Sequence, residues 1–340
     1  MFAVRCWTFG FLSHPHTLIP SHSATPAPPR RPWLGVALRL LIAGLVVWFL
    51  AATVRSAWGD LSDYRLRPRL GWLIAAGCLY LAGLLPCAWV WRRALTALGA
   101  TPKGWPLLRA YFVGHLGKYV PGKAMVVVLR AGLLRDAGAN ARAAAIAVLY
   151  ETLTMMAIGA ALAAGIIAVM VRSEPALALL AAGLAVVSFL PTLPPVFRFL
   201  ATRLRLNGAG EKAPNRLASF ELHWAIVNWL AIAVGWVLIG ASLWAVLQSM
   251  PWEGGGESAT DAVHTLALCT AAAALATVAG FLSLLPGGIL VREAVLVLLL
   301  GEAGLNRADA LIAAVLLRVV WLAAELLISA LLYFAARPRR

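Results

Sequence analysis

The sequence predicts an all-α integral membrane protein, a polytopic helical bundle of about seven or eight spans. Of the 340 residues, 62% are hydrophobic and only 13% are charged, and the mean hydropathy is +0.84. Long apolar runs recur from residue 34 onward, each near the roughly 20 residues that a helix needs to cross a hydrocarbon core. Two further apolar stretches are broken by Gly and Pro, which predicts re-entrant elements arranged as a pseudo-repeat.

The elements follow one another without an intervening soluble domain. Residues 1–32 are rich in Pro, Ser and His without sustained periodicity, so we expect a disordered tail or an upstream extension there. The remaining 33–337 form the predicted transmembrane domain. The sequence predicts continuous spans at about 34–54, 70–91, 143–171, 175–198, 223–249, 263–285 and 308–336, and broken stretches at about 105–129 and 287–300.

Charge in the loops predicts the orientation and the neighbours of the chain. The segments 92–109, 198–220 and 337–340 are basic and are expected on the cytoplasmic side, whereas 250–262 carries only acidic charge. The loop 55–69 conflicts with this pattern, since it holds four Arg. A net charge of +15 favours anionic lipid headgroups as partners. We expect a multi-pass protein of the cytoplasmic (inner) membrane and no nucleic-acid partner, because the basic residues are scattered among apolar spans.

The first broken stretch contains GKYVPGKA, residues 117–124, which fits the phosphate-loop pattern G-x-x-x-x-G-K-[ST] at all but its last position. Ala124 cannot offer the hydroxyl that ligates magnesium, and Pro121 lacks the N–H that a phosphate cradle would use. A nucleotide-binding loop is therefore not predicted.

The same stretch is apolar enough to enter the bilayer, yet it carries His115, Lys118, Lys123 and Arg130. A charged side chain at membrane depth costs at least about 2.5 kcal/mol, and broken backbone is tolerated there only when it is buried in protein or lines a wet cavity. We therefore expect a re-entrant hairpin whose half-helices meet near Pro121. The alternative is an amphipathic interfacial segment whose lysines reach the cytoplasmic surface.

A second break, LPGGILVRE at 285–293, resembles the first. Each break has Pro-Gly followed by an Arg, Arg130 or Arg292, and each precedes an ionisable residue inside a long span, Glu151 or Arg318. Paired breaks of this kind indicate a transport site at a repeat interface. We expect Glu151 and Arg318 to pair across the cavity, with Glu325 as a second acceptor on the face of Arg318. The alternative for Glu151 is a residue that only holds two helices together. For Glu325 a structural bridge between helices is the favoured interpretation, and His115 is expected to be a satisfied polar residue.

Motifs for catalysis are not found in the sequence. There is no HExxH, GxSxG or Asp-rich metal-pyrophosphate motif, and Asp60 and Asp63 form a bare DxxD. The cysteines Cys6, Cys78, Cys87 and Cys269 are far apart and predict neither disulfides nor a metal site. We expect no catalytic residue, no metal and no cofactor, although a hydrolase or transferase stays an alternative.

The run GHLGKYVPGKAMVVVLRAGLLRDAGAN, with Glu151 downstream and LPGGILVREAVLVLLL late in the chain, resembles the transmembrane-domain family of lysylphosphatidylglycerol synthase. This domain is the flippase portion of the multiple peptide resistance factor. The resemblance covers about 34–336 and implies a bundle with two re-entrant elements around a cavity open toward lipid. Some members of the family are fused to a soluble C-terminal aminoacyl-transferase domain. For those members, the resemblance implies that the transmembrane domain moves an aminoacylated phospholipid between leaflets. The sequence stops at Arg340, so we do not expect the synthase activity of the fused members here. It has Leu290 where the family commonly has Gly, which we expect to stiffen the second break.

The sequence thus predicts a flippase-like protein that moves or presents an anionic phospholipid or a polyprenyl-phosphate-linked lipid in cell-envelope biogenesis. The alternative is a non-transporting scaffold for an envelope glycosyltransferase or lipid-modifying enzyme, which would then be a partner. The expected lipid-binding residues are Lys118, Tyr119, Gly122, Lys123, Arg130, Gly287, Gly288 and Arg292. The expected gating and charge-balancing residues are Glu151, Glu293, Arg318 and Glu325.

Overall fold

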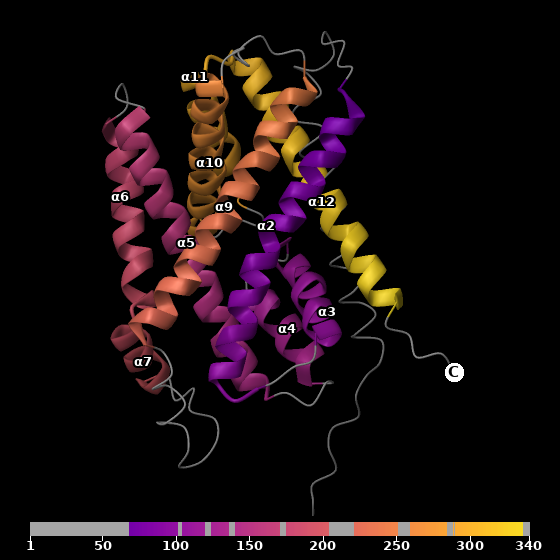
Figure 1. Cartoon of the computed structure of the whole chain (residues 1–340), viewed down its shortest axis with the longest axis vertical. Coiled ribbons are helices and arrows are strands. Elements are labelled where there is room, and N and C mark those ends of the chain that lie inside the picture. Colours follow the sequence, from indigo (N-terminus) through magenta and orange to yellow (C-terminus); the bar gives the residue numbers. More distant parts are fainter. Residues whose placement is uncertain are drawn as a thin grey trace, which may run out of the picture. The chain divides into compact units, whose positions relative to one another are not determined.

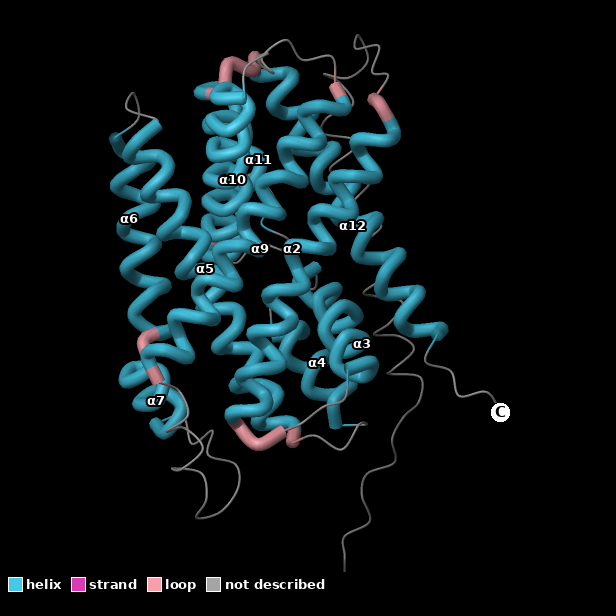
Figure 2. Tube along the Cα trace, viewed as in Figure 1, coloured by secondary structure: helices cyan, strands magenta, loops and turns pink. Residues whose placement is uncertain are grey.

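A computed structural model describes residues 68–100, 104–119, 124–135, 140–170, 175–203, 221–250, 259–283, 288 and 290–335. The chain divides into two compact units after Leu40, and all described residues belong to the second unit. Every regular element in these ranges is a helix, as Figure 2 shows. The predicted tail at 1–32 and the predicted span at 34–54 lie outside the described residues.

Five helices among the described residues are long and apolar enough to cross a membrane. A 28-residue helix is about 42 Å long, more than the roughly 30 Å of a hydrocarbon core. This confirms an all-helical, multi-pass membrane protein, while the total of seven or eight spans stays a prediction. The five helices are α2 (Leu70–Ala97), α5 (Ala141–Met170), α9 (Leu222–Ser249), α10 (Ala259–Leu282) and α12 (Arg307–Ala335).

The stretch predicted as one span at 175–198 consists of three helical pieces. The chain turns after Phe189 because Pro191, Pro194 and Pro195 follow, and prolines remove backbone donors that a continuous helix requires. The three pieces are α6 (Pro175–Phe189), the 3₁₀ turn η2 (Leu190–Thr192) and α7 (Pro194–Arg203).

Both predicted breaks are present, and each joins two helices that pack against one another (Figure 1). The first separates α4 (Ala124–Arg135) from α3 (Gly104–His115) and the 3₁₀ turn η1 (Leu116–Tyr119) that follows α3. The second separates α10 from α11 (Val291–Glu302). At 12 residues, α3 and α4 are each about 18 Å long, too short to cross a bilayer alone. A re-entrant path for either hairpin stays a prediction.

Leu290 begins α11 in an unusual backbone conformation, with φ 66° and ψ −43°. This region favours glycine, because a side chain there clashes with the backbone. Gly288, two residues earlier, also has a positive φ of 68°. Two described residues of the second break thus have a positive φ, and Leu290 occupies a position that suits Gly better.

Helices α2 and α9 run antiparallel, since the backbone N–H of Arg69 donates to the carbonyl of Ser249 at 2.9 Å. Midway along the pair, Gly83 and Gly235 bring the two backbones together. A Cβ added to either glycine would lie 2.8 Å from the carbonyl oxygen of the other. Small residues permit this close approach between membrane helices.

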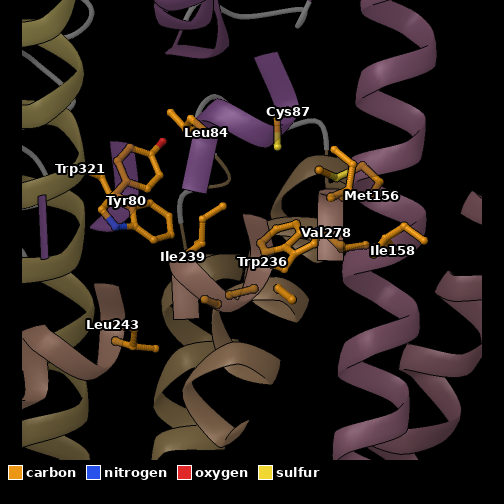
Figure 3. Packing of buried hydrophobic residues seen from close by; sticks show 14 of the residues in the cluster. Tyr80, Leu84, Cys87, Met156, Ile158, Trp236, Ile239, Leu243, Val278 and Trp321 are labelled. Atoms are coloured by element: carbon orange, nitrogen blue, oxygen red, sulfur yellow. The ribbon is translucent and has the colours of Figure 1, made fainter. Parts of the chain in front are cut away.

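The core of the unit is built around aromatic rings. The rings of Tyr80 and Trp321 stack on one another, as Figure 3 shows. The Trp236 indole donates to the carbonyl of Met155 at 2.9 Å. These contacts fix α2, α5, α9 and α12 around the ionisable residues described next.

Candidate functional site

Two neighbouring cavities occupy the region where the two breaks meet. The inner cavity has a volume of about 130 Å³, and several ionisable side chains are among the residues that line it. Side chains from nine elements reach it, so its shape depends on the whole fold. The polar and aromatic side chains that line it are Tyr80, His115, Lys118, Arg130, Glu151, Thr152, Trp236, Thr277, Arg292 and Trp321.

The first ion pair joins α4 to α5. Arg130 Nη1 lies 2.9 Å from Glu151 Oε2, and the Tyr111 hydroxyl of α3 donates to Glu151 Oε1 at 3.1 Å. The Arg130 guanidinium also stacks over the Tyr111 ring at 4.0 Å from its centroid. Arg130 is 1% exposed and Glu151 is 3% exposed. The carboxylate is thus held on both oxygens, which stabilises the three helices against one another.

The second group joins η1 to α2 and α12. Glu325 Oε1 accepts hydrogen bonds from both Lys118 Nζ and the Tyr80 hydroxyl. Lys118 Nζ also lies 3.1 Å from the Tyr80 hydroxyl and 3.2 Å from His115 Nε2. His115 Nδ1 in turn lies 3.4 Å from Arg130 Nη2. His115, which the sequence predicts to be a satisfied polar residue, has partners on both ring nitrogens and connects the first group to the second.

The third group joins the second break to α12, and it corrects the predicted pairing of Glu151 with Arg318. Arg318 pairs with Glu293 of α11 instead, and its Nη2 donates to the carbonyl of Gly288 at 3.3 Å. Each pair forms between helices that pack directly, α4 with α5 and α11 with α12. Packing between neighbouring helices thus decided the partners, and the cross-cavity pairing was wrong.

Arg292 differs from these paired groups. It makes no ion pair within the described residues. Its Nη2 donates to the Thr277 hydroxyl of α10 at 3.1 Å, and its guanidinium lies 5.1 Å from the centroid of the Trp321 ring. Gly280 and Gly288 make room for its aliphatic stem, because a Cβ added to them would lie 2.5 Å and 2.9 Å from Arg292 Cγ. Arg292 is therefore a cation in the cavity that no carboxylate pairs with in the described part of the chain.

The outer cavity, of about 260 Å³, adjoins the inner one and is mostly apolar. Lys118 and Arg292 line both cavities and so lie at the junction between them. The outer wall includes Leu149, which is 37% exposed. Its apolar lining consists of Val126, Val127, Val148, Leu149 and Phe281.

The structure brings most of the predicted site residues to this region. Lys118, Arg130, Glu151 and Arg292 line the inner cavity, and Gly288 lines the outer one. The ring of Tyr119 lies 5.1 Å from Lys118 Nζ. Glu293, Arg318 and Glu325 form the ion pairs around it. Gly122, Lys123 and Gly287 lie outside the described residues.

Sequence reasoning missed four contributors: Tyr80, Tyr111, Thr277 and Trp321. Each is a polar or amphipathic side chain in an otherwise apolar helix, and that isolation is the signal that could have identified them. Their partners are far away in sequence, so the hydrogen bonds themselves could not be inferred.

Comparison with known protein families indicates a lipid-related membrane protein. The family model described as the lysylphosphatidylglycerol synthase TM region matches residues 36–329, which includes both breaks and all three ion-pair groups. A comparison with curated proteins gave no match. The chain belongs to the lysylphosphatidylglycerol synthase TM region family.

Proposed function

We propose that the protein is a lipid translocase of the cytoplasmic (inner) membrane, which moves or presents an anionic phospholipid or a polyprenyl-phosphate-linked lipid in cell-envelope biogenesis. One observation carries the proposal: Arg292 and Lys118 lie at the junction of two cavities, an inner one lined by several ionisable side chains and an outer one lined mostly by apolar side chains. That arrangement matches an amphiphile with an anionic head. Membership of the family supports a lipid-related role.

In this proposal the lipid phosphate occupies the inner cavity. At about 130 Å³ it has room for roughly four waters of about 30 Å³ each, which suits a phosphate group but not a whole lipid. Arg292 supplies two N–H donors in a fork, and Lys118 supplies a compact charge. The acyl or prenyl chain lies along the outer cavity, against Val126, Leu149 and Phe281.

The ion pairs have different roles in this scheme. Arg130 is buried and ion-paired with Glu151, so we assign it to holding the hairpin rather than to direct contact with lipid. Lys118 is paired with Glu325 in the structure, and in this scheme an incoming phosphate competes with Glu325 for the Lys118 ammonium group. Release of Glu325 from Lys118 would then loosen η1 from α12. We propose this exchange as the gate, and we propose that the lipid leaves chemically unchanged.

The experiment is a flipping assay in proteoliposomes with a fluorescent phosphatidylglycerol and dithionite quenching. Arg292→Gln removes the charge, and Arg142→Gln is the matched control because Arg142 is exposed at the start of α5 and lines neither cavity. Since a charge-assisted hydrogen bond contributes about 1.5–3 kcal/mol, we expect Arg292→Gln to slow flipping at least about tenfold. Arg142→Gln should flip at the unaltered rate.

Equal thermal stability of the two variants shows that folding is intact. Unaltered flipping by Arg292→Gln would contradict the proposal. A purified protein that does not flip any lipid, yet copurifies with an envelope enzyme, would support the scaffold alternative instead.

A further inference from the structure

A third pocket, of about 430 Å³, lies between the end of α2 and the start of α9. It shares no lining residue with the two cavities of the candidate site. Its side chains are two indoles, two guanidiniums and two small residues. They belong to Trp89, Arg92, Arg93, Thr96, Ala97 and Trp224.

The pocket lies at the ends of two candidate membrane spans. The hydrogen bond from Arg69 to Ser249 places the start of α2 beside the end of α9. The end of α2 and the start of α9 therefore share the opposite membrane interface. Trp89 and Trp224 are both within ten residues of those helix ends, where tryptophan rings lie at headgroup depth. Arg92 and Arg93 belong to a segment that the sequence places on the cytoplasmic side.

Arg93 is held in place between the two indoles. Its guanidinium carbon lies 4.7 Å from the Trp89 ring centroid and 5.4 Å from that of Trp224. The Trp224 ring packs on Tyr150 of α5 at 5.1 Å, and Tyr150 is 1% exposed. The guanidinium is thus positioned by buried structure rather than extended freely into solvent.

Neither arginine of this pocket has an acidic partner among the described side chains. The C-terminus of α2 attracts cations, but its partial charge is only about half a unit. Two guanidiniums therefore leave a net positive potential over the pocket. Arg92 is exposed and Arg93 is half-buried, so both can reach a ligand from the membrane surface.

We propose that this pocket binds the phosphate of an anionic phospholipid from the cytoplasmic leaflet, at a site separate from the transport cavities. Guanidinium groups bind phosphate in a bidentate manner. The indole faces cover the glycerol and ester region, which an inorganic phosphate lacks. The volume falls in the range of about 300–1,000 Å³ typical of small-ligand pockets.

The test is native mass spectrometry of the full-length protein, titrated with phosphatidylglycerol, phosphatidylcholine or inorganic phosphate. The double variant Arg92→Gln/Arg93→Gln removes both charges. The matched control is Arg69→Gln, an exposed arginine at the opposite end of α2. At about 1 kcal/mol per basic residue near a membrane surface, we expect the double variant to bind one phosphatidylglycerol about 30-fold more weakly. The control should bind it as the unaltered protein does.

Two further variants separate a binding defect from a folding defect. Arg93→Lys keeps the charge and should retain most of the affinity, whereas Trp89→Leu keeps both charges and should lose part of it. Equal phosphatidylglycerol binding by the double variant and the control would overturn the proposal. So would equal affinity for phosphatidylcholine, or binding of inorganic phosphate as tight as that of phosphatidylglycerol. Arg292→Gln should still bind phosphatidylglycerol in the third pocket. A failure of the pocket proposal is therefore distinguishable from a failure of the transport proposal.

Discussion

The rings of Tyr80 and Trp321 stack with their centroids 4.4 Å apart and their planes 10° from parallel. This contact connects the two breaks, because each ring also faces the cation of one break. Lys118 Nζ lies 5.7 Å from the Tyr80 centroid, and the Arg292 guanidinium lies 5.1 Å from the Trp321 centroid. Two segments about 170 residues apart in sequence thus contact one aromatic pair, which places both cations in one cavity.

Loss of the Trp321 ring should weaken the contact between the two broken segments. Trp321→Leu removes the stack on Tyr80 and the hydrogen bond to the Ser242 hydroxyl. We expect the free energy of unfolding to fall by about 3 kcal/mol. We also expect the protein that remains folded to flip lipid more slowly than the unaltered protein does. Trp321→Phe keeps a ring and should retain most of the flipping. The control is Trp244→Leu, which removes an indole that packs on Trp72 outside the cavities. Thermal unfolding in detergent and the dithionite assay measure both quantities.

Removal of one partner of the buried pair should destabilise the hairpin. Glu151→Gln leaves the Arg130 guanidinium buried without its counter-charge, and such changes cost about 3–5 kcal/mol. The double variant Arg130→Met/Glu151→Leu replaces the pair with apolar side chains of similar volume and should recover much of that loss. A double-mutant cycle on thermal unfolding checks this. If Glu151→Gln unfolds at the temperature of the unaltered protein, the pair does not hold α4 on α5.

The sequence alone predicted the membrane class, the two breaks and four charged residues that line the inner cavity, Lys118, Arg130, Glu151 and Arg292. Hydropathy identified α2, α5, α9, α10 and α12, because a helix in lipid must be apolar over its length. Charges in an apolar run predicted the cavity, because Lys118 and Arg292 cannot face lipid.

Pairing could not be predicted in the same way. The assignment of Glu151 to Arg318 relied on charge alone, whereas the actual partners, Arg130 and Glu293, depend on which helices pack together. The broken span at 175–198 was missed for a different reason. Its hydropathy is continuous, and its prolines had to be weighed as breaks in the helix.

A glycine at position 290 should stabilise the second break. Leu290 has φ 66°, and a non-glycine residue in such a conformation costs of order 1–3 kcal/mol. Its side chain is 72% exposed, so little packing is lost on removal. We expect Leu290→Gly to raise the free energy of unfolding by about 1 kcal/mol. Leu298→Gly, at an exposed position inside α11, should lower it by a similar amount. If both variants changed the free energy of unfolding in the same direction, the backbone at Leu290 would not be strained.

A methyl group at Gly280 should displace Arg292 without changing any charge. A Cβ there would lie 2.5 Å from Arg292 Cγ and 3.2 Å from the Gly288 Cα, so the arginine stem or the turn must move. We expect Gly280→Ala to slow flipping about tenfold, since small misplacements of a binding group have large effects on rate. The control is Gly301→Ala, because nothing lies within 4 Å of a Cβ at that position. Comparable flipping by the two variants would show that the position of Arg292 does not matter.

The central claim is that a lipid phosphate binds between Lys118 and Arg292. An electron cryo-microscopy structure of the protein in nanodiscs of phosphatidylglycerol tests it most directly. The proposal predicts phosphate density within hydrogen-bond distance of the Arg292 guanidinium, with an acyl chain along Val126 and Phe281. Cavities without lipid density, in a map that resolves lipids elsewhere around the protein, would contradict it.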